Sequence, residues 1–243
     1  MCGIIGFKGS FTPGNVALVR GLLEQSQIRG KHATGVSYLH KGAIKTLKEP
    51  SPVHAFLLLH WDKIVADLQE ETEISLIAHT RYSTSGLEHN QPYADEVLSV
   101  AFNGVVTQAD PSRWKELYGF EPKTTNDVEI LHHVMSEGGD PLSQLGTASL
   151  AVVALKRNGV VIAFRNGYRP MYTAHSRNNP NTVVVASTMQ ILTRAGIPDV
   201  DVTYMESGRS SHLCKDKDEF GDTVYAAFVS MNENKRDLQT EKF

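Results

Sequence analysis

The sequence predicts an α+β fold in which antiparallel sheets and helices are segregated along the chain. Four closely spaced strand candidates follow one another between residues 148 and 187, and the helix candidates divide clusters of strands. A doubly wound parallel sheet would instead show a helix after nearly every strand. The clustering therefore favours antiparallel strand pairing.

In the first half of the chain, short apolar runs predict strands and longer periodic segments predict helices. Val16, Val19 and Leu23 fall on one face of a helix that Gly30 is expected to stop. The polar segment 80–96 has almost no apolar periodicity and predicts a loop. The expected strands are 2–9, 33–39, 43–47, 73–79 and 97–104, and the expected helices are 15–30 and 53–68.

The second half continues with a helix and then a run of strands. Asn126 is the expected N-cap of a helix over 126–139, with Glu129 completing a capping box and two glycines ending the helix. The charged tail, 232–243, is expected to be loose. The remaining expectations are strands at 148–155, 160–167, 171–174, 183–187 and 223–231, and a short helix at 188–197.

Length and composition narrow the possible classes of protein. Apolar segments are spread evenly over the 243 residues, which favours one domain over 1–243. The formal net charge is −3 with acids and bases interspersed, so no nucleic-acid partner is expected. No apolar run reaches the roughly 18–20 residues of a membrane span, and no secretory leader is recognisable, so no membrane association is expected. Two cysteines do not suggest a disulfide framework, which favours a reducing, cytoplasmic location. We expect neither metal nor cofactor.

Cys2 raises the main functional question, because a nucleophilic side chain directly follows the initiator methionine. A cysteine attacks as the thiolate and needs a nearby base. If Met1 is removed, the free α-amine, with an unperturbed pKa of about 7.7–8.0, can serve as that base. The alternative is that Cys2 is a small buried hydrophobic residue of the first strand.

Four further motifs bear on this choice. Each has an ordinary structural explanation: Arg81 as a solvated charge, Asn103-Gly104 as a turn, and Asp127 as a first-turn acid that complements a helix dipole. Together, in this order behind an N-terminal cysteine, the four motifs supply chemical groups that a single reaction could use. The motifs are RGKHATG (29–35), IAHTRYSTSG (77–86), AFNGVV (101–106) and TNDVEIL (125–131).

With these motifs the chain resembles a class II glutamine amidotransferase domain of the N-terminal-nucleophile hydrolase superfamily, over about residues 2–197. The resemblance implies a four-layer αββα sandwich of two stacked antiparallel sheets. It also implies attack by the N-terminal cysteine on the side-chain amide of L-glutamine. Ammonia leaves, and water hydrolyses the resulting γ-glutamyl thioester to glutamate.

The resemblance also implies roles for the catalytic groups. Cys2 is the nucleophile and its α-amine the base and then the acid. Asn103 and Gly104 form the oxyanion hole through a side-chain amide and a backbone N–H. Arg29 supports the N-terminal region.

For the substrate, the resemblance assigns three binding residues. Arg81 holds the α-carboxylate with its guanidinium fork, Thr84 is a neighbouring hydroxyl, and Asp127 binds the α-ammonium. Ser85 is a supporting residue that stands where a glucosamine-synthase-like domain has histidine.

Other departures from the family pattern leave these groups in place. His32 stands where the family commonly has aspartate, and Phe102 where it often has histidine. RNGYRPMYTA and VVASTMQIL resemble later family segments, with Thr188 in place of a glutamate.

The leading hypothesis is therefore a glutamine-hydrolysing enzyme that supplies ammonia to a separate synthase acting in trans. No synthase domain or Walker-type loop is recognisable in the chain. One alternative is an amidohydrolase that cleaves another γ-glutamyl amide. A second is a non-catalytic binding subunit, which is disfavoured because the chain retains Cys2, Arg81, Asn103, Gly104 and Asp127 together.

Overall fold

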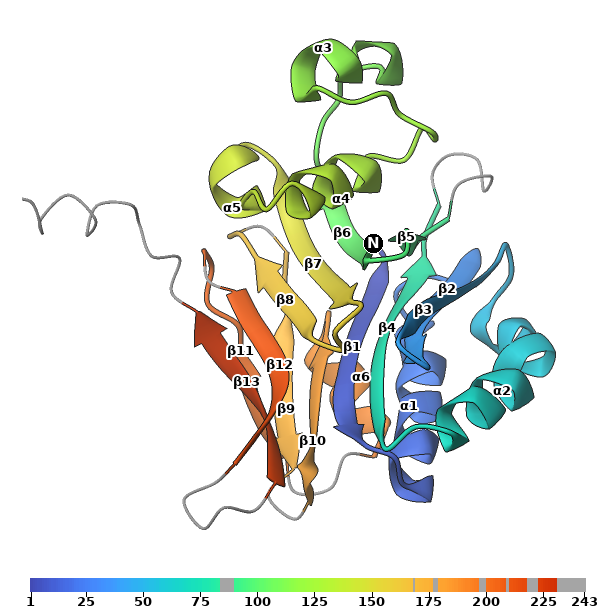
Figure 1. The fold of residues 1–243 in the computed structure, drawn as a ribbon. Coiled ribbons are helices and arrows are strands. Elements are labelled where there is room, and N and C mark those ends of the chain that lie inside the picture. Colours follow the sequence, from blue (N-terminus) through green and yellow to red (C-terminus); the bar gives the residue numbers. More distant parts are fainter. Residues whose placement is uncertain are drawn as a thin grey trace, which may run out of the picture.

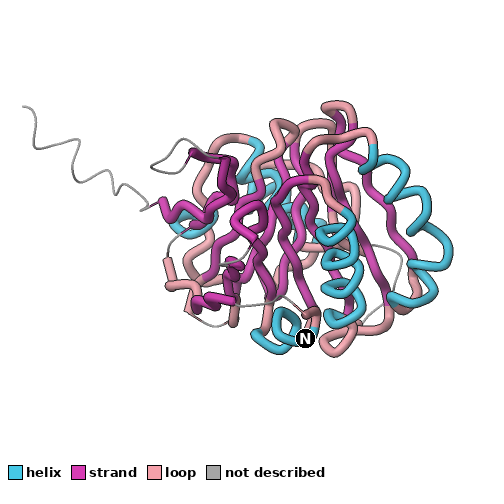
Figure 2. Tube along the Cα trace, turned by 90° about the horizontal axis from the view of Figure 1, so that it is seen from below, coloured by secondary structure: helices cyan, strands magenta, loops and turns pink. Residues whose placement is uncertain are grey.

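The structure is a computed structural model that describes residues 1–83, 90–167, 169–176, 179–196, 200–208, 210–217 and 223–230. Two antiparallel sheets are stacked face to face, and helices flank the stack (Figures 1 and 2). This confirms the predicted α+β class and the four-layer αββα sandwich. The expected loose tail, 232–243, lies outside the described residues.

The first sheet contains both the N-terminal strand and its neighbour β4. Its strands pair antiparallel in the order β11-β9-β10-β1-β4-β2-β3. Their bounds are β1 Gly3–Ser10, β2 Ala33–His40, β3 Ala43–Glu49, β4 Glu73–Arg81, β9 Tyr172–Ser176, β10 Asn179–Ala186 and β11 Val200–Tyr204.

The second sheet contains β6, which carries the Asn-Gly pair. Its order is β13-β12-β8-β7-β6-β5, again with antiparallel pairing. The bounds are β5 Tyr93–Ala94, β6 Leu98–Val105, β7 Ser149–Lys156, β8 Val161–Arg165, β12 Ser210–Lys217 and β13 Thr223–Ser230.

Helices cover the outer faces of both sheets through separate apolar cores. Phe7 and Leu76 of the first sheet pack with Leu23 and Phe56, and Val100 of the second packs with helical residues around Ile130. The first outer layer comprises α1 Pro13–Ser26, α2 Val53–Gln69 and α6 Met189–Arg194. The second comprises the 3-10 turn η1 Pro111–Arg113, α3 Trp114–Tyr118, α4 Val128–Ser136 and α5 Pro141–Gln144.

A third core lies between the two sheets and fixes which side chains face inward. Ile4 and Ile77 of the first sheet pack there with Ala101 and Ala151 of the second. Because alternate residues of a strand share a face, residues two positions away from these also point into the space between the sheets.

Several elements were missed by the sequence analysis. The strands β5, β11 and β12, the short helices α3 and α5, and η1 were not expected. Most are short, and the pattern of β12 (SSHLCKDK) is polar. Pairing with β8 and β13 places it in the sheet, and local periodicity carries no signal of such long-range pairing. The loop expected at 80–96 also contains β5, and β4 continues to Arg81.

The predicted capping box at α4 was wrong. The N-cap residue is Asp127, while the Asn126 side chain accepts a hydrogen bond from the Val128 N–H at 3.2 Å. Glu129 accepts from the Lys123 N–H at 2.9 Å rather than from Asn126. The Glu129 carboxylate therefore accepts from a backbone N–H that lies before the helix instead of from the N–H of the N-cap residue.

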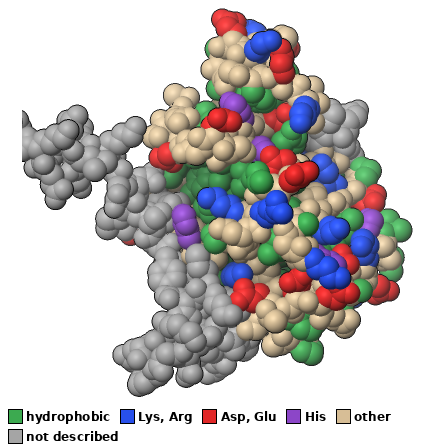
Figure 3. Space-filling model, in the orientation of Figure 1, with side chains coloured by type: hydrophobic (Ala, Val, Ile, Leu, Met, Phe, Trp, Pro, Cys, Tyr) green, Lys and Arg blue, Asp and Glu red, His purple; other side chains and the backbone are tan. Residues whose placement is uncertain are grey.

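Basic and acidic side chains are interspersed on the face shown in Figure 3. Among the described residues, no helix is long and apolar enough to span a membrane. The same part of the chain holds no group of three or more histidine, cysteine or acidic residues placed to bind a metal ion.

Candidate active site

Cys2 lies immediately before β1, at one end of the space between the sheets. Gly3 pairs with Thr80, so continuing the register by one residue places Cys2 across from Arg81. Cys2 shares the inward face with Ile4, and its backbone N–H donates to Asn103 Oδ1 at 3.4 Å. The N-terminus is thereby joined to both sheets, near β4, β5 and β6 in Figure 1.

Close packing holds this end of the chain in place. A Cβ atom on Gly3 would lie 2.7 Å from the carbonyl oxygen of Ser26 and would also overlap the Thr80 side chain. The Thr80 hydroxyl donates to that same carbonyl at 2.9 Å. Arg29 Nε donates to the Cys2 carbonyl at 3.3 Å. The first residues are therefore clamped between α1, β4 and the segment that follows α1.

Arg29 is the charged group nearest to Cys2 among these contacts. Its pKa is lowered, chiefly by burial, while the interaction with Cys2 acts in the opposite direction. A cation at this position can stabilise negative charge that develops on the sulfur during a reaction.

Asn103 brings an unpaired hydrogen-bond donor to Cys2. It lies on β6 two residues after Ala101, facing inward, and is only 4% exposed. Its Oδ1 accepts from Cys2, but its Nδ2 is buried and has no hydrogen-bond partner. Leaving such a donor unpaired costs about 1–3 kcal/mol. Among the described residues, the hydrogen-bonding capacity of this amide group is therefore unused.

Gly104 follows with an unusual backbone conformation at φ +157°. Any Cβ here would overlap the Ser149 carbonyl group on the neighbouring strand β7. Only glycine allows β6 and β7 to approach this closely, next to the unpaired amide of Asn103.

Arg81 ends β4 on the inward face, two residues after His79. Its Nη1 donates to Asn90 Oδ1 at 2.9 Å. Its carbonyl accepts from the His32 N–H at 2.9 Å, and His32 Nδ1 accepts from the Ser83 N–H at 2.9 Å. His32 therefore joins the segment before β2 to the segment after β4.

Asp127 lies at the N-terminus of α4. Its Oδ2 accepts from the Val106 N–H at 2.7 Å, so it is fixed to the segment that leaves β6. Burial raises the pKa of this carboxyl group, although backbone hydrogen bonds from Val106 and Thr107 oppose the shift.

The structure therefore brings the predicted residues together to different degrees. Cys2, Asn103 and Arg29 are in direct contact, and Arg81 lies on the strand beside Cys2. Asp127 is linked to Asn103 through the end of β6, and among the described residues no hydrogen bond joins Asp127 to Cys2. Thr84 and Ser85 lie outside the described residues.

Two residues next to the site were not anticipated. Asn90 binds Arg81, and Gln91 is 7% exposed. Gln91 Oε1 accepts from the Phe102 N–H at 2.7 Å, and its Nε2 donates to Asn126 at 3.5 Å. Gln91 thus fixes the residue before Asn103 relative to the start of α4. The only sequence signal was the polar NQP triplet within a segment that lacks periodicity.

His79 is a fully buried histidine beneath Arg81. Its pKa is lowered to about 3, first by burial and then by Arg81, while a backbone hydrogen bond with Phe102 opposes the shift. The imidazole therefore stays neutral in the folded protein at pH values where an exposed histidine is protonated.

We expect this histidine to make the protein less stable in mild acid. Between pH 6.5 and about 3 the unfolded chain binds a proton that the folded chain does not, so stability falls as pH decreases through this range. His79 alone should lower the free energy of unfolding by about 2 kcal/mol between pH 7 and pH 5. Urea unfolding at both pH values should show that His79→Gln loses less unfolding free energy than the wild-type protein does. The exposed control His54→Gln should keep the wild-type loss, and equal losses in all three proteins would contradict the account.

Comparison with known proteins finds similarity at the level of structure. No protein-family model and no curated protein sequence matches the chain. Among solved structures, glutamine phosphoribosylpyrophosphate (PRPP) amidotransferase from B. subtilis, complexed with ADP and GMP, matches with a TM-score of 0.63 at 20% identity. A structure described as the allosteric regulatory enzyme of purine biosynthesis matches with a TM-score of 0.65 at 21% identity.

Each match covers 95% of this chain and 50% of the other, so the chain spans about half the length of these proteins. At this identity the likeness concerns the fold. It confirms, at that level, the resemblance to the glutamine amidotransferase domain that the sequence motifs indicated.

Proposed function

We propose that this chain hydrolyses the side-chain amide of L-glutamine, with Cys2 as the nucleophile, and supplies the ammonia to an acceptor enzyme. The observation that carries the proposal is the buried, unpaired Nδ2 of Asn103 on a side chain that also contacts the Cys2 backbone nitrogen. A free oxyanion donor beside an N-terminal thiol is the arrangement that acyl transfer from an amide requires.

The first half of the reaction forms the thioester. Once Met1 has been removed, the α-amine of Cys2 takes the thiol proton and the sulfur attacks the γ-carbonyl carbon of glutamine. The oxyanion accepts hydrogen bonds from Asn103 Nδ2 and the Gly104 N–H. The C–N bond then breaks, the α-ammonium returns its proton to the leaving group, and ammonia departs.

The second half restores the enzyme. The same amine takes a proton from water, the resulting hydroxide attacks the thioester, and the C–S bond breaks to give glutamate and the thiol. The net reaction is glutamine plus water to glutamate plus ammonia, and it uses only groups of this chain.

Arg81, Thr84 and Asp127 are proposed to bind the head group of the substrate. Arg81 offers a planar fork to the α-carboxylate and is oriented by Asn90. Asp127 offers one carboxylate to the α-ammonium while Val106 holds it in place. Ser85 and Arg29 are proposed to support this arrangement.

We expect Asn103→Asp to lower kcat by about 10²–10³-fold with a smaller effect on KM, because the variant keeps Oδ1 but loses the donor. Steady-state ammonia release measures the effect. Asn158→Asp is the matched control, since Asn158 caps the turn between β7 and β8 by accepting from the Val160 N–H, as aspartate also can. A normal kcat in Asn103→Asp would exclude the oxyanion role.

Arg81→Lys and Asp127→Asn should each raise KM for glutamine about 10- to 100-fold, the range for losing a hydrogen bond to a charged group. Lysine keeps the charge of Arg81 without its fork. Asparagine at 127 keeps an oxygen acceptor for Val106, so a purely structural Asp127 predicts an almost unchanged KM. Kinetics of both variants, with exposed Arg113→Lys as control, distinguish binding from scaffolding.

Two alternatives remain testable with the same protein. An amidohydrolase would use the same head-group residues but turn over another γ-glutamyl amide faster than glutamine, which a panel of γ-glutamyl amides reveals. A non-catalytic subunit would bind glutamine without consuming it. If the protein releases amine from another member of the panel faster than it releases ammonia from glutamine, that compound would replace glutamine as the proposed substrate.

The acceptor is proposed to be a separate ammonia-using synthase. Arg29 and Arg81 border the site, and a partner that packs against the segments that carry them can complete it. We therefore propose that hydrolysis is slow in isolation and accelerates when the synthase binds. Glutaminase assays with and without proteins captured from the native host test this, and full-speed hydrolysis by the isolated chain would argue against gating.

A further inference from the structure

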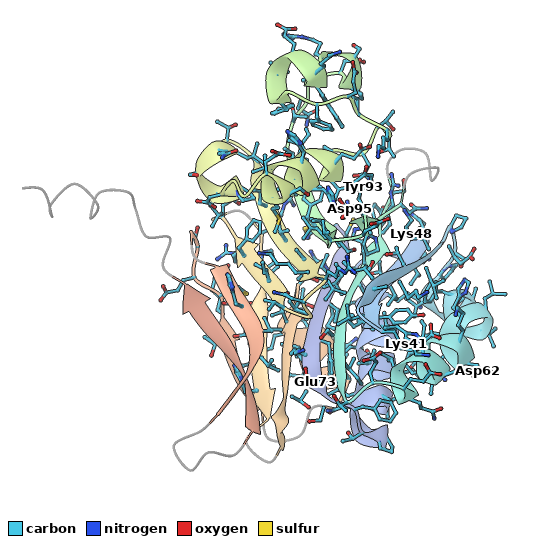
Figure 4. All side chains as sticks on the ribbon, viewed as in Figure 1. Lys41, Lys48, Asp62, Glu73, Tyr93 and Asp95 are labelled. Atoms are coloured by element: carbon cyan, nitrogen blue, oxygen red, sulfur yellow. The ribbon has the colours of Figure 1, made fainter. Side chains whose placement is uncertain are left out.

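The edge of β6 that faces away from β7 is only partly covered by another strand. Tyr93, labelled in Figure 4, and Ala94 form β5 and pair there with Val100 and Ser99. Beyond Val100, no described strand pairs with this edge. Buried backbone N–H groups at an uncovered strand edge need other acceptors.

Side chains supply these acceptors at alternate residues. The Phe102 N–H donates to Gln91 Oε1 at 2.7 Å, and the N–H of Val106, the residue directly after β6, donates to Asp127 Oδ2 at 2.7 Å. Alternate residues of an antiparallel strand direct their N–H groups to the same edge. Gly104 lies midway between Phe102 and Val106, so its N–H points to this edge as well.

The pairing across the sheet agrees with this direction. Gly104 is paired with Leu150 of β7. Leu150, however, uses its N–H and its carbonyl oxygen to bind Asn166 on the β8 side, at 2.9 and 3.0 Å. Its backbone groups therefore point away from β6, as in a residue pair that exchanges no hydrogen bonds. The Gly104 N–H is accordingly directed away from β7, to the edge that Gln91 and Asp127 border.

Gln91 is itself held on several sides. Only 7% of the residue is exposed, and its Nε2 donates to Asn126, next to Asp127, at 3.5 Å. A Cβ atom on Gly35 of β2 would overlap the Gln91 carbonyl, so the main chain of this segment packs directly on β2. One buried side chain therefore joins the backbone of β6 to the start of α4.

We propose that Gln91 is a positioning residue for the oxyanion hole. By binding the Phe102 N–H it fixes the course of β6 immediately before Asn103 and Gly104, which supply the oxyanion donors in the proposed reaction. The inference rests on the proposed glutamine hydrolysis, in which Gln91 itself touches neither the substrate nor the nucleophile. Displacing catalytic groups by about 1 Å can cost about 10²-fold in rate.

Gln91→Met tests the proposal, because methionine has a similar shape but offers no strong acceptor to the Phe102 N–H. We expect kcat for glutamine to fall by about 10–100-fold. KM should change little, since Arg81 and Asp127 keep their own contacts. Amide hydrogen exchange, followed by NMR, gives a readout that does not depend on activity: the Phe102 N–H should exchange about 10-fold faster in the variant.

Matched variants separate positioning from a general loss of stability. Gln91→Glu should retain most of the activity, because burial favours a neutral carboxyl group, which can accept from Phe102 and donate to Asn126. Gln190→Met changes an exposed glutamine on α6 and should behave like the wild type. If Gln91→Met does not fold, Gln91→Asn replaces it: its amide is one carbon too short to reach Phe102, so it should show the same loss of kcat.

Three results would overturn the inference: a normal kcat in Gln91→Met, an equal loss of kcat in Gln91→Glu, or an unchanged exchange rate of the Phe102 amide. Failure of the proposed function has a different signature. The wild-type protein would then release no ammonia from glutamine, alone or with proteins captured from its host, and both proposals would fall. Turnover by the wild type together with an unaffected Gln91→Met would overturn the positioning role alone.

Discussion

Cys2→Ala is expected to abolish glutamine hydrolysis while leaving the fold intact. Alanine fits the half-buried position immediately before β1 and keeps the backbone N–H that contacts Asn103, but it removes the sulfur atom that forms the thioester. Loss of a nucleophile that acts together with its base can cost about 10⁶-fold in kcat. Ammonia release should therefore fall to the background rate, with an unchanged thermal melting profile.

Covalent labelling gives this prediction a second readout. A diazo-ketone analogue of glutamine should add once to the wild-type protein, at the peptide that begins with Cys2, and not to Cys2→Ala. Cys214→Ala is the matched control and should retain both labelling and turnover. Labelling that persists in Cys2→Ala would show that another residue is the nucleophile.

Keeping an N-terminal extension on Cys2 should also inactivate the enzyme. An acylated nitrogen is an amide without a basic lone pair, so general-base catalysis worth about 10²–10⁴-fold is lost. In the structure, where Met1 is attached, its sulfur lies 3.4 Å from Arg29 Nη2, and additional residues would crowd this region. A fusion whose N-terminal extension can be cleaved by a protease next to Cys2 allows both forms to be assayed from one preparation.

The expected result is a gain in glutaminase rate of at least 100-fold on cleavage. The same extension placed at the C-terminus should have no effect. Equal rates before and after exposure of Cys2 would rule out its amine as the base.

The sequence predicted the inner layers of the fold well because their strands are apolar and regular. The short apolar runs of β4 and β6 correctly predicted strands, and the motifs at the ends of these strands contain Arg81 and Asn103. The capping-box prediction failed because Glu129 has a local partner in Lys123 that no spacing rule describes. Edge elements such as β5 and β11 are too short for periodicity, and they form through pairing with distant strands.

The candidate site was likewise predicted only in part. The position of Cys2 behind Met1 and the resemblance of the motifs pointed to Cys2 and Asn103, but they did not predict the contact between these residues. Gln91 and Asn90 were not predicted because each meets its partner only when the chain folds back. Gln91 contacts Phe102, and Asn90 contacts Arg81. The unpaired amide of Asn103 is likewise a property of three-dimensional packing.

One measurement tests the central claim most directly. Purified protein shown by intact mass to begin at Cys2 is mixed in excess with L-glutamine, quenched in acid at short times and analysed by mass spectrometry. The account predicts equal amounts of ammonia and glutamate, with a transient γ-glutamyl adduct on the N-terminal peptide. A folded protein with a free Cys2 amine that gives neither adduct nor ammonia, alone or with proteins captured from its host, would contradict it.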